Sequence, residues 1–130
     1  AGRFEALPPL RLRAEVALGN ALLAAGRVDD AQAVLAGAVG DTADPGLLAA
    51  LLCARANAAR LGQQPERALP LLQQALVHLD GPARLDARLQ ALNLLAHTQY
   101  MLGRPAEAIA TLEATLAEAE RARLMPVLRT

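Results

Sequence analysis

A short pattern occurs three times along this chain of 130 residues and constrains its fold more than any other feature. Each copy has a glycine, a short polar turn, an alanine, a leucine four residues later and a small residue three further on. The alanines are Ala31, Ala68 and Ala108, at separations of 37 and 40 residues. A spacing of four and then three places these positions on one face of an α-helix. Recurrence at such intervals predicts one helical unit that is stacked three times.

A second helical run precedes each glycine turn, over residues 10–25, 45–61 and 82–102. Each unit is therefore predicted to be a helix, a turn and another helix, since the residue after a helix end often needs a positive φ that suits glycine. Asp44 is a candidate N-cap for the second of these runs. Prolines fall near the predicted helix starts, where a missing N–H costs nothing; they are Pro9, Pro45, Pro65, Pro82, Pro105 and Pro126.

Pro70 is the exception, because it lies inside the second helix of the second unit. It removes one backbone hydrogen bond there, so that helix is predicted either to kink at Pro70 or to start late. The preceding turn, from Gly62 to Ala68, is one residue longer than the turns of the other two units.

Alanine and leucine make up nearly half of the chain, whereas the only aromatic residues are Phe4 and Tyr100. This composition favours helices, since strands prefer β-branched and aromatic residues. We therefore predict an all-α fold of three stacked antiparallel helix hairpins, because one hairpin cannot bury its apolar face alone. The whole chain is expected to be one domain, with residues 123–130 forming the start of a further helix or a tail. The predicted units span about residues 10–40, 45–79 and 82–122.

The 13 cationic residues are all arginine and are balanced by 13 acidic ones, so the net charge is zero. A protein that binds nucleic acid or an anionic membrane needs a basic excess, so neither is expected as a direct partner. The single cysteine, Cys53, cannot form an internal disulfide, which favours a reducing, cytoplasmic setting. The longest apolar run, residues 47–54, is too short to span a bilayer, and no signal-peptide pattern is evident at the N-terminus.

The pattern resembles the tetratricopeptide repeat over about residues 10–122. The bulky aromatic positions of that family hold Leu, Ala, Gln or Glu here, Thr115 replaces a small alanine, the closing proline is missing, and the period exceeds the usual ~34 residues. The resemblance implies a short right-handed superhelix whose concave face is formed by the first helix of each unit. The matching residues are Leu18, Gly19, Asn20, Gly26, Ala31, Leu35 and Ala38 in the first unit, Ala56, Ala68, Leu72 and Ala75 in the second, and Leu92, Leu95, Ala96, Gly103, Ala108 and Leu112 in the third.

The long, Ala- and Leu-rich period is also similar to the sensor repeats of large bacterial ATP-dependent LuxR-type regulators of the maltotriose-responsive kind. That second resemblance implies a sugar-like effector. Residues 124–128 are typical of the opening of another helix, and the polar capping helix that terminal repeats usually need is not evident. The chain is therefore expected to be part of a larger bacterial regulator or scaffold.

Polar residues recur at matched positions of the three first helices. Asn20, Asn57 and His97 each lie eleven residues before an alanine of the repeat. Amides both donate and accept hydrogen bonds, so they suit a peptide backbone or sugar hydroxyls. The alternative is that any amphipathic helix has a polar face, and both interpretations remain open. The candidate residues for binding a partner or ligand are Asn20, Asn57, Arg60, Asn93, His97 and Tyr100.

Chaperone adaptors of the tetratricopeptide family bind a C-terminal carboxylate through Lys, Asn and Arg side chains. Asn20 and Asn57 resemble the asparagines of that clamp. The lysine positions hold Val16 and Asn93, and the chain contains no lysine. A clamp of this kind is therefore not expected.

No sequence motif points to catalysis, a metal or a cofactor. Cys53 lies among leucines without a Cys-His context, which favours a small core or groove residue. His78 and His97 lack metal-ligand spacing, and the glycines do not form a phosphate-binding loop. The arginines at positions 84, 88, 121 and 123 suggest either anion binding or (i, i+4) surface pairing with nearby acids such as Asp80, and pairing is favoured.

We therefore predict a non-catalytic module that recognises a protein or peptide on its concave face. One alternative is a small-molecule sensor domain of a transcription regulator that takes a sugar-like effector. Another is a self-association module, because uncapped helical ends expose apolar residues such as Leu124, Met125 and Leu128.

Overall fold

The computed structural model describes the backbone of residues 2–38 and 42–129 and the side chains of residues 9–38 and 42–123. All regular elements of these residues are helical, so the predicted all-α class is confirmed. None of the described helices is long and apolar enough to cross a membrane. The elements are α1 (Gly2–Ala24), α2 (Val28–Gly37), α3 (Pro45–Leu61), α4 (Pro65–Val77), the short 3-10 helix η1 (Pro82–Arg84), α5 (Leu85–Met101) and α6 (Pro105–Arg129).

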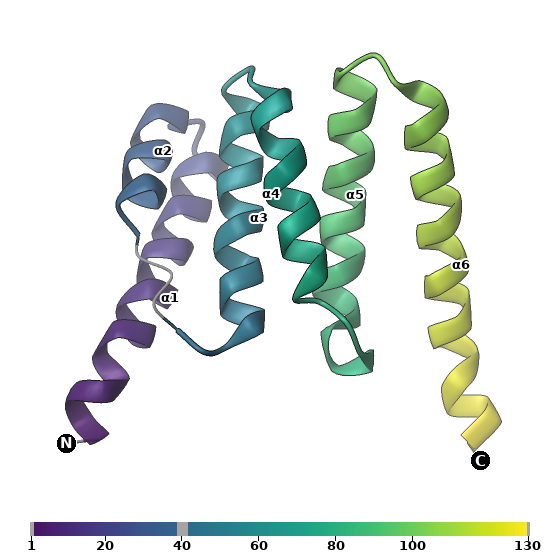
Figure 1. The fold of residues 1–130 in the computed structure, drawn as a ribbon, viewed down its shortest axis with the longest axis horizontal. Helices are drawn as coiled ribbons and strands as arrows, with labels where there is room; N and C mark the ends of the chain where they lie inside the picture. Colours follow the sequence, from purple (N-terminus) through teal and green to yellow (C-terminus); the bar gives the residue numbers. More distant parts are fainter. Residues whose placement is uncertain (1, 39–41, 130) are drawn as a thin grey trace.

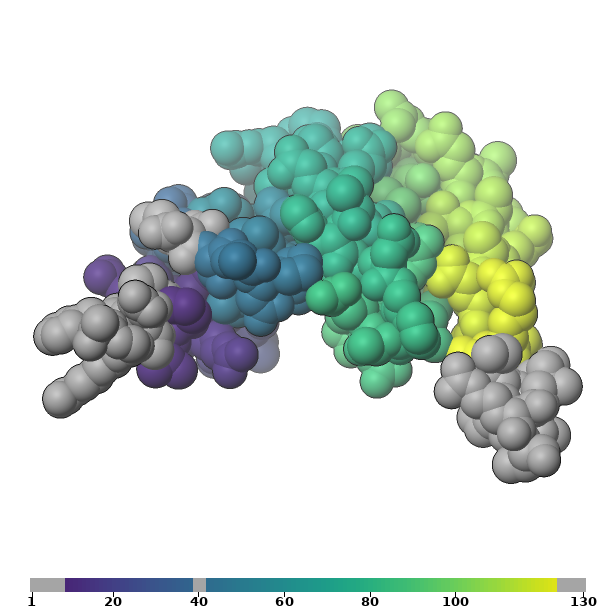
Figure 2. Space-filling view, turned by 60° about the horizontal axis from the view of Figure 1, so that its bottom comes forward, coloured from purple at the N-terminus to yellow at the C-terminus, as the bar shows by residue number. Residues whose placement is uncertain are grey.

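The helices stand side by side in one row, and each packs against its neighbours in the sequence (Figure 1). Figure 2 shows the molecule as an arch that descends toward both chain ends. On one side of the row α3 packs against both α1 and α5, whereas on the other side no comparable packing joins α4 to α2 or α6 among the described helices. The helices α1, α3 and α5 are therefore drawn together more tightly than α2, α4 and α6.

Three tight turns join α1 to α2, α3 to α4 and α5 to α6. In each turn one residue has a positive φ: Gly26 at 79°, Gln63 at 64° and Gly103 at 76°. Each of these residues lies five positions before the alanine of its repeat. The prediction of a longer turn before Ala68 was therefore wrong, because the left-handed residue of that turn is Gln63 and not Gly62.

Gly62 is required for a different reason, since its φ of −85° is open to any residue. A Cβ at Gly62 would lie 2.6 Å from Nε2 of Gln32. That Nε2 donates a hydrogen bond to the carbonyl oxygen of Ala58 at 3.1 Å, and so ties α2 to the last turn of α3. The glycine makes room for this contact between helices.

The second unit begins as the sequence predicts. α3 occupies Pro45–Leu61, and Oδ1 of Asp44 accepts hydrogen bonds from the backbone N–H of Gly46 at 3.0 Å and of Leu47 at 3.4 Å. Asp44 is therefore the N-cap of α3. α4 begins at Pro65 and contains Pro70, so this helix does not start late.

Other boundaries differ from the prediction. α1 begins at Gly2, so Pro9 lies inside a helix and not at its start. α5 is preceded by η1, with Pro82 in the 3-10 helix. α6 continues to Arg129, so a further helix does not open near residue 124, and Pro126 lies inside a helix and not at its start. The side chains of Leu124, Met125 and Leu128 lie outside the described residues.

The interior combines small residues where helices approach closely with leucines beside them. A Cβ at Gly19 of α1 would lie 2.6 Å from the Leu35 side chain of α2. Leu35 and Leu72 are completely buried because the next helix covers each of them. Leu112 occupies the same repeat position in α6 but is 43% exposed, since no described helix follows α6.

Candidate binding groove

A groove of about 340 Å³ lies on the side of the row formed by α1, α3 and α5. Its polar side chains are the amides of Asn20 from α1, Asn57 from α3 and Gln90 from α5. The rest of the wall is small or apolar. The alanine side chains are too short to fill the space between the helices, and this leaves the groove open. The remaining lining residues are Gly46, Ala49, Ala50, Cys53, Ala54, Leu79, Ala87, Ala91 and Leu94.

The groove carries no formal charge, since none of the described residues that line it is ionised at neutral pH. Its polar groups are three carboxamides, each with a carbonyl that accepts and an NH2 that donates. The arrangement can therefore satisfy both the donors and the acceptors of an uncharged ligand, and it offers no counter-ion to a charged one.

Asn57 is held by a neighbour on its own helix. Its Oδ1 accepts a hydrogen bond of 2.7 Å from Nη2 of Arg60, a half-buried side chain. The Nε atom of Arg60 is buried and has no hydrogen-bond partner among the described residues. Arg60 thus orients the Asn57 carboxamide and leaves its NH2 group as the available donor.

The structure brings together only part of the predicted set of binding residues. Asn20 and Asn57 line the groove and Arg60 bonds to Asn57, whereas Asn93, His97 and Tyr100 are exposed and do not line it. Tyr100 is 69% exposed. At about 100° per residue, His97 lies on nearly the same face of α5 as Gln90 but two turns further along the helix, whereas Asn93 and Tyr100 are turned away from Leu94.

Sequence reasoning left Gln90 out of the candidate set although a signal for it exists. Gln90 lies eighteen residues before Ala108, and Ala50, which also lines the groove, lies eighteen before Ala68. Two positions, eleven and eighteen residues before the repeat alanine, therefore each supply two residues that line the groove. Leu79 follows α4 outside any regular element, and no repeat offset points to it.

Cys53 lies at the groove and is half-buried, as favoured from the sequence. Burial raises the pKa of its thiol from 9.0 to about 11. A thiol with such a pKa is protonated at neutral pH, and the protonated form is a poor nucleophile. Cys53 therefore contributes a small, neutral surface to the groove.

A second cavity, of about 650 Å³, lies between α2, α3 and α4 on the other side of the row. Arg55 lines it and donates hydrogen bonds from Nε to the carbonyl oxygen of Leu35 at 3.0 Å and from Nη2 to that of Ala38 at 2.7 Å. These bonds satisfy carbonyls at the C-terminal end of α2, where helical partners are missing. The Arg55 side chain thus caps the C-terminal end of α2.

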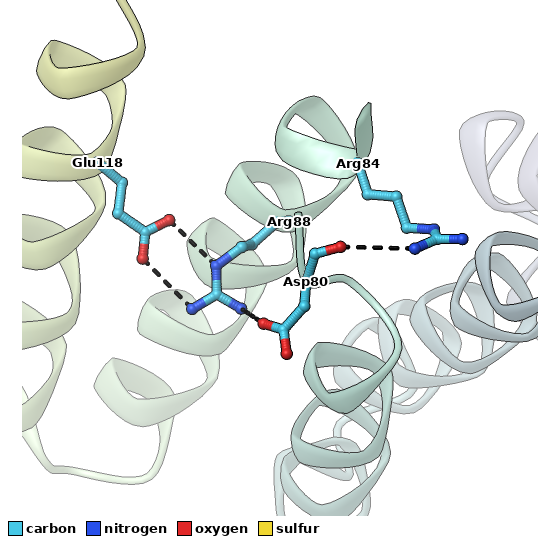
Figure 3. A network of polar contacts seen from close by, with 4 residues as sticks. All are labelled: Asp80, Arg84, Arg88 and Glu118. Carbon is cyan, nitrogen blue, oxygen red and sulfur yellow. Dashed lines mark hydrogen bonds and ion pairs between the residues drawn. The ribbon is translucent and has the colours of Figure 1, made fainter. Parts of the chain in front are cut away.

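The arginine cluster near α5 is an ion-pair network (Figure 3). Arg88 holds Glu118 of α6 through two bonds, from Nε at 3.1 Å and Nη2 at 3.3 Å, while its Nη1 lies 3.8 Å from Oδ1 of Asp80. The hydrogen bond to Glu118, together with the negative charges of Glu118 and Asp80, raises the pKa of Arg88 above its usual value. Pairing with an acid is confirmed for Arg88, but the predicted (i, i+4) spacing is wrong for its main partner, which lies on another helix 30 residues along the chain.

Arg84 and Arg123 are also engaged. Arg84 donates to the backbone carbonyl of Asp80 at 3.5 Å, and Arg123 lies 3.7 Å from the carboxylate of Glu120. Within the described part of the chain, no group of three or more His, Cys, Asp or Glu side chains is placed to hold a metal ion. Comparison with protein-family models, with curated protein sequences and with solved structures finds no match to this chain.

Proposed function

We propose that the protein is a non-catalytic binding module of the tetratricopeptide type, in which α1–α2, α3–α4 and α5–α6 are three hairpins of a short right-handed superhelix. Its inner face recognises a segment of a partner protein or peptide. One observation carries this proposal: amides from the first helix of each of the three units meet in one uncharged groove. The module belongs to a larger bacterial regulator or scaffold and acts in the cytoplasm.

The groove chemistry favours an extended, neutral peptide segment. A peptide backbone presents alternating N–H and C=O groups, which three carboxamides can pair at once. A volume of about 340 Å³ accommodates one or two residues, and the alanine-lined wall contacts an apolar side chain. Because the helices are packed before the partner arrives, little ordering entropy is lost on binding.

A neutral sugar-like effector is the second candidate. Hydroxyl groups also donate and accept, and the absence of charge from the described lining residues suits a sugar. The volume lies near the lower end of small-ligand sites, roughly 300–1,000 Å³. In this alternative the module senses an effector on behalf of a transcription regulator.

The test uses two probes, a phage-displayed library of random peptides and a panel of neutral mono- and oligosaccharides. Dissociation constants of selected probes are measured by calorimetry for Asn20→Ala and Gln90→Ala. Asn93→Ala and Gln73→Ala are the matched controls, since both side chains are exposed and neither lines the groove. We expect each groove variant to bind several-fold more weakly, in line with the loss of one hydrogen bond of about 0.5–1.5 kcal/mol.

The outcomes separate the candidates. Peptides that lose affinity only in the groove variants support peptide recognition, and the same result with sugars alone supports the sensor. Equal losses in Asn93→Ala and Gln73→Ala would remove the groove from the proposal. His97→Ala should leave stability unchanged because the side chain is exposed, and it should weaken only those probes that extend along α5.

A further inference from the structure

The cavity of about 650 Å³ between α2, α3 and α4 is larger than the groove and lies on the other side of the row. Its wall includes α4 from Glu66 to Gln74. Because an α-helix rises 1.5 Å per residue, this part of the wall is about 12 Å long. The cavity therefore extends along the helices. Most of its wall is apolar, formed by Leu35, Ala36, Ala58, Ala59, Pro70 and Leu71.

The charged side chains of the cavity are placed unevenly along it. Arg55 bonds to the carbonyl oxygen of Ala38, at the C-terminal end of α2. Glu66 and Arg67 lie in the first turn of α4. Since α2 and α4 both start at the tight turns and run in the same direction (Figure 1), these two sets of charges lie toward opposite ends of the cavity. One end therefore has a single positive charge, and the other has one charge of each sign.

Arg55 is a half-buried guanidinium that has N–H donors left over. Its hydrogen bonds to two carbonyl oxygens use two of its five N–H groups and fix the direction of the side chain. None of the ion pairs among residues 9–38 and 42–123 involves Arg55. A guanidinium that is sheltered and held in this way binds a carboxylate through charge-assisted hydrogen bonds. The site for an anion is thus formed before any ligand arrives.

We propose that this cavity binds an elongated apolar molecule that ends in one carboxylate, such as a medium-chain fatty acid, with the carboxylate at Arg55. The acyl chain lies along the apolar wall toward the first turn of α4, and the negative charge of Glu66 opposes the reverse orientation. The volume falls within the range of small-ligand sites, roughly 300–1,000 Å³.

A fatty acid fits this wall better than a peptide does. A peptide backbone would place N–H and C=O groups against apolar side chains, where they would lose their hydrogen bonds to water. A fatty acid has its polar atoms at one end only, as the cavity has its lone arginine. This site is independent of the uncharged groove, which lies on the side of α1, α3 and α5.

The test measures the binding of sodium octanoate by calorimetry, with octanamide as the neutral probe of the same length. Octanoate should bind about tenfold more tightly or better, in line with a hydrogen bond to a charged group. Arg55→Ala alone would be ambiguous, because Arg55 also caps α2. The variants are therefore made at Ala36, an exposed residue of the cavity wall in the last turn of α2.

Ala36→Glu places a carboxylate at the Arg55 end of the cavity and should weaken octanoate binding by a similar factor, because it competes for the guanidinium and repels the ligand. Ala36→Gln has nearly the same size without the charge and should bind octanoate as wild type does. Ala33→Glu is the matched control, since Ala33 is an exposed residue of α2 that does not line the cavity. Its affinity should be unchanged. Circular dichroism checks the helical fold of each variant.

Four results would overturn the proposal. Absence of octanoate binding rules out this class of ligand, and equal affinities for octanoate and octanamide rule out recognition of the carboxylate by Arg55. Equal losses in Ala36→Glu and Ala36→Gln would show an effect of bulk and not of charge. Unchanged octanoate binding in Ala36→Glu would place the ligand outside this cavity.

Discussion

The two faces of α5 are held in the molecule by different chemistry. Toward α4 the contact is apolar, with Ala91, Leu94 and Leu95 in shared clusters. Toward α6 the contact adds polar bonds between helices to the buried Ala108: the Thr111 hydroxyl donates to Oε1 of Gln99 at 2.8 Å, and Arg88 holds Glu118.

The position of a helix in the row explains the difference. α4 has a helix on either side, so its repeat leucine is buried by the helix that follows. α6 has a described neighbour on one side only, so its leucine faces solvent and specific polar bonds supply part of the attachment. The same repeat residue thus has a different energetic role in the middle and at the end of the row.

Truncating the repeat leucine should expose this difference most strongly. Leu72→Ala is expected to lower the free energy of unfolding by about 2–5 kcal/mol, because a completely buried leucine leaves a cavity. Leu112→Ala should lower it by at most about 1 kcal/mol, since its side chain already contacts water. Urea denaturation measures both. Equal losses would mean that α6 is packed as α4 is, and the comparison would fail.

Replacing the repeat alanine by a larger residue tests the same difference between α4, in the middle of the row, and α6, at its end. Ala68→Leu should destabilise the fold by about 1–3 kcal/mol, because α4 is enclosed between α3 and α5 and cannot move to make room. Ala108→Leu should cost less, since α6 can shift away from α5. The ratio of the two losses in urea is the measurement, and a larger loss at Ala108 would contradict the argument.

The helical class and several helix bounds follow from the sequence, because periodicity, caps and turns are local. The span of α3, its N-cap Asp44 and the repeat alanines were predictable in this way. The left-handed residue Gln63 was not, because the adjacent Gly62 gave the more obvious turn signal. Only the packed structure shows that Gly62 accommodates Gln32.

The groove was predictable in part, for reasons of geometry. A recurring offset identified Asn20 and Asn57, since equivalent positions of stacked helices share a face. Gln90 and His97 are two turns apart on nearly the same face of α5, so the choice between them depended on the level along that helix at which its neighbours meet it. Periodicity gives the angle of a residue about the helix axis but not this level.

The Arg88–Glu118 pair joins α5 to α6, and its coupling free energy shows how much this polar contact contributes to the stability of the fold. A double-mutant cycle with Arg88→Ala and Glu118→Ala is expected to give a coupling free energy of about 1 kcal/mol, because the bond is bidentate and both side chains are sheltered. The coupling should fall as salt is added. Asp80→Ala is the control, since Asp80 lies 3.8 Å from Arg88 and is 89% exposed, and its coupling should be near zero. A coupling to Asp80 as large as that to Glu118 would contradict this assignment.

The smallest expected effect concerns the turns that the two regions share. Gln63→Gly should stabilise the protein by about 0.5–1 kcal/mol. A left-handed conformation costs a residue with a Cβ about 1–2 kcal/mol, and glycine removes this cost. Part of the gain is offset because glycine also gives the unfolded chain more conformational entropy. Gly26→Ala, at a φ of 79° with open space around it, should destabilise for the same reason.

Gly62→Ala is the control, because its φ is not left-handed. It should also destabilise the protein, but through a clash with the Gln32 side chain. The double variant Gly62→Ala/Gln32→Ala should therefore recover part of the lost stability. Thermal unfolding of the four variants reports these differences. If Gln63→Gly were destabilising, the side chain of Gln63 would have a role that outweighs its backbone strain, and the three turns would not be equivalent.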